Sequence, residues 1–273
     1  ISNKNIFTFG LPLLFNNLTF FILMWFDKAL LGKYDHLKYV TFYYIAFGFY
    51  SGIMAILKTI YTVFMPYIAG FSADSQEKIQ HNFQLILKYF LQIAIFISIV
   101  SFFAVEPLVK LLYGLDYLPV ITAFRLLIVL IILRAITNPI HMFMLNVYGL
   151  VKENLIISFL LAASTAILDI LLIPLYGYKG AILAATVGYI CFIIGALFVR
   201  KIRKMIWGTM VLNNLGCIAM PVAAIYLLHL LGVKNPFIFL VIVLPVYFIS
   251  LIIIKEFKSE DFEVIKKIIF ISS

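Results

Sequence analysis

Charged residues are scarce in this chain. They make up 12% of its 273 residues, about half the share in soluble globular proteins. Apolar residues reach 64% and the mean hydropathy is +1.11. Disorder is excluded, because a disordered chain combines low hydrophobicity with high charge. A soluble domain is excluded as well, because one core of this size could not bury so much apolar surface. A polytopic membrane protein remains.

Motifs of soluble enzymes are also missing. The sequence has no G-x-S-x-G, no H-E-x-x-H, no Walker A and no G-x-G-x-x-G opening a βαβ unit. Its four histidines are isolated, and its two cysteines lie in apolar runs. The net charge of +9 is spread through apolar segments rather than gathered on a polar domain, which argues against nucleic-acid binding. No catalytic residue and no metal site are predicted, so the chain is expected not to be an enzyme.

Eight long apolar runs are present, each near the ~20 residues that a spanning helix needs. They are too long and too uniformly apolar for barrel strands, and only helices satisfy their own backbone in lipid. The sequence therefore predicts an all-α polytopic transmembrane bundle. The expected spans are 6–28, 42–65, 85–105, 120–144, 155–175, 179–199, 210–231 and 237–254.

The distribution of basic residues predicts the orientation. Eight spans place both ends of the segment on one side, and that side receives roughly twice the basic residues of the other, so both ends are expected to be cytoplasmic at the plasma membrane. After Lys255, apolar residues at helical spacing predict an amphipathic helix on the inner leaflet. Since the chain opens on Ile1 and its first span is too long for a signal peptide, a preceding part is expected to be missing.

Small residues at helical spacing predict close helix packing in lipid. Gly48 and Gly52 form one such pair, and Gly180, Ala184 and Gly188 form a longer row. Because only a short turn separates spans 155–175 and 179–199, these two spans are expected to form an intimate antiparallel pair.

Polar residues at membrane depth are costly and are functional candidates by default. Arg134 lies almost at the centre of its span and must face a cavity or a partner. Lys58 lies about 7 Å inside its span's centre, at about 1.5 Å per residue, and can also snorkel to the headgroups. The adjacent Asn16 and Asn17 project about 100° apart, so at least one faces a polar path or another helix.

Two predicted spans carry an acidic residue, Asp169 within one span and Asp27 at the end of another. Asp169 shares a face with Thr165, and Thr186 lies at a similar depth on the next span. Their oxygen atoms could bind a coupling Na⁺ or relay a coupling H⁺. Alternatively, Asp169 forms an ion pair with Arg134, or it makes a plain hydrogen bond between helices. Asp27 and Lys28 end the first span, as a solvated pair or at the mouth of a cavity.

Three stretches carry a family pattern. They are GLPLLFNNLTFFILMWFDKALLG (Gly10–Gly32), LLYGLDYLPVITAFRLL (Leu111–Leu127) and LDILLIPLYGYKGAILAAT (Leu168–Thr186). The last is the most specific, with a polar residue, an apolar-Pro turn, Tyr-Gly and a Gly-Ala helix start. The stretches resemble the polysaccharide biosynthesis protein family of lipid-linked oligosaccharide flippases, which lies in the superfamily of multidrug and oligosaccharidyl-lipid exporters.

The resemblance implies an architecture and a cavity. Family members have two six-helix lobes, so 1–205 would form the C-terminal lobe and 206–273 would add two helices and a cytoplasmic tail. The N-terminal lobe would be absent from this chain. The cavity between the lobes is commonly cationic and lined by the first two spans of each. The implied lining residues are Asn16, Asn17, Tyr43, Tyr44 and Lys58. Arg134 is expected to join them as a cavity-facing cation because of its depth in the membrane. The two tyrosines fit sugar stacking and an interfacial aromatic belt equally well.

The resemblance also implies a function. The chain is expected to flip a polyprenyl-pyrophosphate-linked glycan across the cytoplasmic membrane by alternating access. Its partners would be that glycan lipid, the bilayer and the N-terminal lobe, with no cofactor other than a coupling Na⁺ or H⁺. A multidrug or cation antiporter of the same superfamily would favour acidic cavity residues over Lys58 and Arg134. A membrane-embedded polyprenyl-glycan ligase or polymerase would need a large loop outside the membrane.

Overall fold

The computed structural model describes residues 3–34, 37–70, 75–206, 210–230 and 235–253, which are almost entirely helical. The helices are α1 (Asn3–Tyr34), α2 (Leu37–Gly70), α3 (Gln76–Leu112), α4 (Pro119–Met142), α5 (Val151–Tyr176), α6 (Tyr178–Phe198), α7 (Arg200–Ile206), α8 (Met210–Leu230) and α9 (Pro236–Ile253). A 3₁₀ turn precedes α4, and a short π-helix follows it. Apart from the short α7, each helix coincides with a predicted span, which confirms the all-helical prediction over the described residues.

Membrane-crossing helices can be recognised by length and hydropathy. Six described stretches are long and apolar enough to cross a membrane, namely 37–62, 76–112, 115–145, 151–176, 178–198 and 236–253, while α8 contributes a shorter apolar stretch, 219–228. The polytopic bundle is therefore confirmed. The cytoplasmic location of the ends stays a prediction, and the tail helix expected after Lys255 lies outside the described residues.

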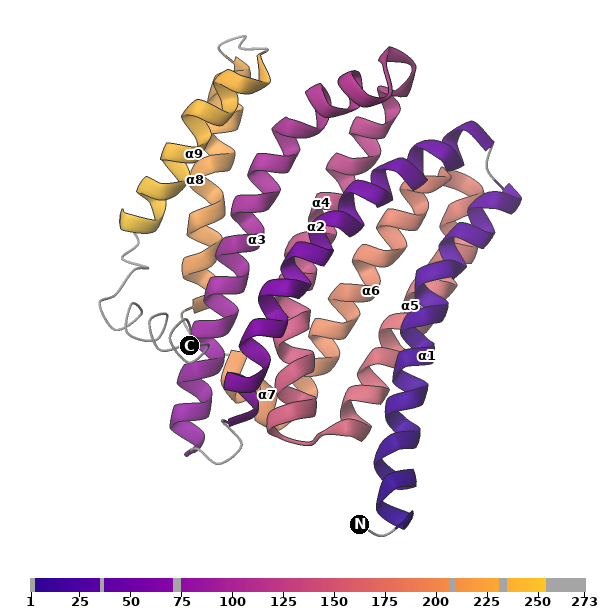
Figure 1. Cartoon of the computed structure of the whole chain (residues 1–273), viewed down its shortest axis with the longest axis vertical. Helices are drawn as coiled ribbons and strands as arrows, with labels where there is room; N and C mark the ends of the chain where they lie inside the picture. The colour runs from indigo at the N-terminus through magenta and orange to yellow at the C-terminus, as the bar shows by residue number, and fades with distance from the viewer. Residues whose placement is uncertain (1–2, 35–36, 71–74, 207–209, 231–234, 254–273) are drawn as a thin grey trace.

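Helices α1 and α2 meet near the 35–36 connection and diverge from there, with α6 visible between them (Figure 1). Each packs against a different partner, since α1 lies along α5 and α2 lies along α4. Few direct contacts join α1 to α2. The divergence leaves the interior of the bundle lined by five helices, α1, α2, α4, α5 and α6.

Helices α5 and α6 are the most closely packed pair. A Cβ atom on Gly180 would meet the carbonyl group of Leu172, and one on Gly188 would meet Oγ1 of Thr165. The predicted intimate pair is therefore confirmed, and glycine is required there by the close backbone approach.

Gly48 and Gly52 differ from that pair. Both are exposed on α2, and a Cβ on either would have no heavy atom within 4 Å. Neither glycine contacts another described helix, so the predicted close packing does not occur among the described residues. The same exposed face of α2 carries Ser51, Ala55 and Thr59.

Helices α8 and α9 pack on α3, on the side away from α1 and α5 (Figure 1). Phe103 of α3 stacks on Phe239 of α9, with ring centroids 5.1 Å apart and an interplanar angle of 22°. The buried Tyr247 hydroxyl donates to the Gln92 carbonyl oxygen at 2.8 Å. A second apolar core therefore joins α9 to α3. The division of the chain at residue 205 stays a prediction.

Candidate functional site

A charged cavity of about 240 Å³ lies between α1, α2, α4, α5 and α6. Its walls are apolar in part, but each of the five helices contributes at least one polar side chain, with Tyr189 coming from α6. The polar and aromatic lining residues are Asp27, Lys28, Tyr43, Phe47, Tyr50, Arg134, Thr165 and Tyr189. We call this space the charged cavity.

The α1 end of the charged cavity is a buried ion pair. Lys28 Nζ lies 3.2 Å from Asp27 Oδ1, and the other carboxylate oxygen accepts a 2.6 Å hydrogen bond from the Tyr43 hydroxyl. Both members of the pair are buried. The interpretation of Asp27 and Lys28 as a solvated pair is therefore wrong. It failed because α1 continues to Tyr34, so the pair lies well inside the helix instead of ending it.

Helix α5 carries Thr165 and Asp169 one turn apart, as predicted, and Thr165 lines the charged cavity. Both are buried, with Asp169 only 1% exposed. Asp169 Oδ1 has no hydrogen-bond partner among the described residues. Asp169 is close enough to Asp27 and Lys28 to interact with both electrostatically. The Thr186 hydroxyl instead donates to the Ile182 carbonyl within α6 at 2.8 Å.

Arg134 reaches into the charged cavity from α4. Its Nη1 donates a long, 3.4 Å hydrogen bond to the Tyr50 hydroxyl, and its guanidinium lies 6.0 Å from the centroid of the Tyr189 ring. Its buried Nε has no hydrogen-bond partner among the described residues. Ion pairs between described residues join Asp27 to Lys28, and Glu106 to Lys110 and Arg125. The Asp169–Arg134 ion pair is therefore not formed in this structure.

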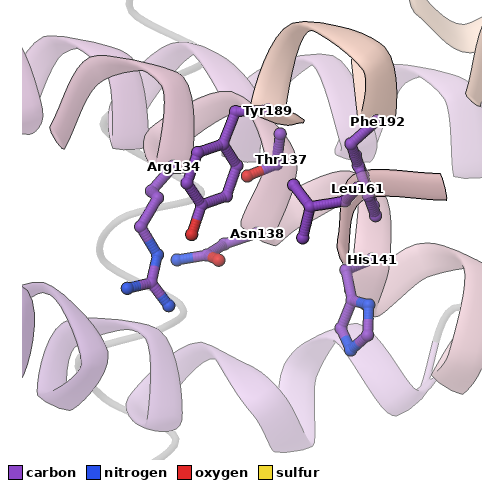
Figure 2. Close-up of a pocket in the computed structure, with 7 residues that line it drawn as sticks. All are labelled: Arg134, Thr137, Asn138, His141, Leu161, Tyr189 and Phe192. Atoms are coloured by element: carbon purple, nitrogen blue, oxygen red, sulfur yellow. The ribbon is translucent and has the colours of Figure 1, made fainter. Parts of the chain in front are cut away.

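A second space of about 180 Å³, which we call the polar cavity, is lined by Arg134 and six other residues (Figure 2). It shares Arg134, Leu161 and Tyr189 with the charged cavity. Thr137, Asn138 and His141 extend it along α4, at the spacing of one helix face. Arg134 therefore lines both spaces in the interior of the bundle.

The remaining predicted cavity residues lie elsewhere. Tyr43 is buried inside the bundle, whereas Tyr44 is 44% exposed in a groove with Gly48 and Tyr113. Lys58 is exposed on α2. The side chains of Asn16 and Asn17, in α1, lie outside the described residues. The structure thus brings Tyr43 and Arg134 to one cavity and places Tyr44 and Lys58 on the surface of α2.

Sequence reasoning missed Tyr50 and Tyr189 as members of the charged cavity, and it gave Asp27 and Lys28 a place at a cavity mouth only as one alternative. The sequence analysis considered Asp27 and Lys28, but it ended the first span at residue 28 and therefore placed both residues at the membrane interface. The two tyrosines carried no distinguishing signal among 16. Their placement depends on which helices pack together.

The described helices form a membrane bundle whose interior holds buried ionisable groups. Residues 2–122 match the model of the polysaccharide biosynthesis protein family. The structure is similar to a solved structure of the lipid II flippase MurJ in an inward closed conformation, with a TM-score of 0.65 and 18% identity, over 92% of this chain and 54% of that chain. No curated protein matches the sequence.

These findings confirm the resemblance that the sequence predicts. The family match covers α1, α2, α3 and the start of α4, and the similarity of fold extends over nearly the whole chain. The family match thus covers a little under half of the chain, and the solved structure shows a similar fold. The chain spans about half the length of the flippase structure, at 54%.

Proposed function

We propose that this chain is the second lobe of a transporter that flips a polyprenyl-pyrophosphate-linked glycan across the cytoplasmic membrane by alternating access. The observation that carries the proposal is Arg134, a guanidinium in the interior of a membrane bundle without a carboxylate partner among the described residues. A buried cation without a counter-charge is costly in lipid. A pyrophosphate group supplies that charge, and arginine binds phosphate oxygens with paired hydrogen bonds.

The exposed face of α2 supports a second lobe opposite this one. Ser51, Lys58 and Thr59 lie on it together with Gly48 and Gly52. A polar stripe facing lipid would be costly, whereas one facing a water-filled cavity or a second lobe would not. The chain covers about half of the flippase structure, which leaves room for such a lobe. On this arrangement Lys58 faces the substrate, and Tyr44 offers a ring on which a sugar can stack.

The coupling ion is proposed to act at Thr165, Asp169 and Thr186, with Na⁺ and H⁺ as the candidates. The unpartnered Oδ1 of the buried Asp169 supports a role beyond packing. The hydrogen bond of Thr186 within its own helix means that this hydroxyl would have to turn to join the other two.

A cation antiporter of the same superfamily is the second candidate. It is favoured by two buried acidic residues, Asp27 and Asp169, since such transporters favour acidic cavities. Arg134, which lines the same cavity as Asp27, favours the flippase, because a guanidinium repels a cationic drug.

The test is transport by the full-length protein in proteoliposomes. Arg134→Ala and Lys58→Ala should each reduce flipping of a fluorescent polyprenyl-pyrophosphate glycan at least about tenfold, a factor that corresponds to about 1.4 kcal/mol. Lys33→Ala, at the exposed end of α1, is the matched control and should flip normally. Normal flipping by both cavity variants would contradict the cationic cavity. Efflux of a cationic dye by the wild-type protein, without flipping, would favour the antiporter.

A further inference from the structure

Lys28 has an unusually complete set of partners for a lysine inside a membrane bundle. Its ammonium group lies 3.2 Å from Asp27 Oδ1 and 2.6 Å from the Met24 carbonyl oxygen. It also lies 3.8 Å from the centroid of the Phe47 ring. One carboxylate, one carbonyl and one ring face match the three N–H donors of a lysine. Only 8% of the residue is exposed, so water contributes little to its solvation.

One carboxylate is bonded to this ammonium group, and a second lies within electrostatic range of it. Asp27 is paired with it directly, and Asp169 interacts electrostatically with both Asp27 and Lys28 while its Oδ1 lacks a hydrogen-bond partner. The ammonium group of Lys28 is directed at Asp27, the Met24 carbonyl oxygen and the Phe47 ring, which leaves no donor for a second carboxylate. Asp169 therefore has a cation nearby without a bond to it.

The other helices around this group contribute mostly oxygen atoms. Tyr43 of α2 binds Asp27, and Thr165 of α5 lines the same cavity. Tyr50 and Tyr189 lie farther along the cavity with the second cation, Arg134, which is bonded to Tyr50. Carboxylate and hydroxyl oxygens are ligands for a hard cation. The place that such a cation would take near Asp27 is already held by Lys28 Nζ.

We propose that Lys28 is the built-in cation of the charged cavity, occupying the position that a free Na⁺ would take beside Asp27 and Asp169. A second positive charge a few ångströms from Lys28 is repelled strongly, because the cavity is shielded from bulk water. Lys28 therefore determines ion specificity: it excludes Na⁺ from this cavity in the wild-type protein. Removing its charge leaves two carboxylates and two hydroxyl groups that can hold a monovalent cation.

The exclusion of Na⁺ by Lys28 does not depend on the proposed transport function. Only its consequence for coupling rests on that function, because Na⁺ would no longer be a candidate coupling ion in this cavity. Occupancy itself is measured without transport. A failure of flipping assays therefore leaves the Lys28 result intact, and an altered Na⁺ affinity leaves the flipping result intact.

The test is binding of ²²Na⁺ to the full-length protein in nanodiscs, with choline chloride holding the ionic strength constant. The wild-type protein and the control variant Lys33→Gln should show no saturable binding. Lys28→Gln should show saturable binding together with a Na⁺-dependent rise in melting temperature. Adding Asp169→Asn to Lys28→Gln should abolish both signals.

Two results would overturn the proposal. One is saturable Na⁺ binding by the wild-type protein that Asp169→Asn removes. The other is a folded Lys28→Gln variant, judged by gel filtration and circular dichroism, that binds no Na⁺. If Lys28→Gln does not fold, Na⁺ binding is measured on the wild-type protein and on Lys28→Arg, which retains the positive charge. Absence of saturable binding supports the proposal, and its presence refutes it.

Discussion

The hydroxyl of Tyr43 lies 2.6 Å from Oδ2 of Asp27, and this hydrogen bond joins α2 to α1 across an interface with few other contacts. The same carboxylate holds Lys28 with its second oxygen. Asp27 therefore links the two helices that line the charged cavity, and a change at its partner Tyr43 should be felt by both.

Tyr43→Phe should destabilise the protein by about 1–3 kcal/mol, because it leaves a buried carboxylate oxygen without its donor. Unfolding in detergent, followed by circular dichroism, measures the loss. Tyr44→Phe is the matched control, since Tyr44 is exposed and is expected to change stability little. Equal effects of the two variants would contradict the structural role of the Tyr43–Asp27 bond.

Gly188→Ala should cost about 1–3 kcal/mol through overpacking between α5 and α6. The added methyl group would collide with Thr165 Oγ1 and approach the Leu161 carbonyl oxygen at 3.1 Å, which only a shift of the helices can relieve. Gly48→Ala, which meets nothing within 4 Å, serves as the comparison and should leave the stability of this chain unchanged. The difference between their melting temperatures is the measurement.

Glu106→Gln should change stability by less than about 1 kcal/mol, although it breaks two ion pairs. Glu106 lies 2.7 Å from Lys110 and 3.3 Å from Arg125, but these side chains are about one third exposed or more. Arg125 also stacks over Phe102, with its guanidinium carbon 4.6 Å from the ring centroid, and the variant retains that contact. A loss above about 2 kcal/mol, twice the upper value for exposed pairs, would show that this pairing is more deeply buried in the membrane than its exposure indicates.

Asp169→Asn should change how transport depends on the driving-ion gradient, because it removes the charge of the proposed coupling site while keeping the shape of the side chain. Flipping measured in proteoliposomes with an imposed proton or sodium gradient provides the check. Asp116→Asn, near the exposed 3₁₀ turn before α4, is the control and should retain the wild-type dependence. An unchanged dependence in Asp169→Asn would remove Asp169 from the coupling mechanism.

The spans could be predicted from the sequence because hydropathy and segment length are local properties. The same holds for Thr165 and Asp169, which share a face by helical periodicity. The position of Arg134 inside the bundle followed from the cost of its charge in lipid. Its tyrosine partners did not, since Tyr50 is 84 residues away and depends on how α2 packs against α4.

Two predictions were wrong, one about where the first helix ends and one about which glycines pack against another helix. The first span was ended at Lys28, although α1 continues to Tyr34, and this placed a buried ion pair at the interface. Gly48 and Gly52 have the spacing of a packing motif, but spacing alone does not say which helix is packed. Gly188 has a similar spacing and does contact its neighbour, Thr165.

The length of α3 connects this protein to the thickness of its membrane. Its 37 residues extend about 55 Å at about 1.5 Å per residue, well beyond a hydrocarbon layer of about 30 Å. A helix of this length must tilt or project from the bilayer, and α9 is fixed to it through Phe239 and Tyr247. Thinner membranes therefore favour a larger tilt of α3 and carry α9 with it, so lipid composition becomes a physical control on the conformation of the whole bundle.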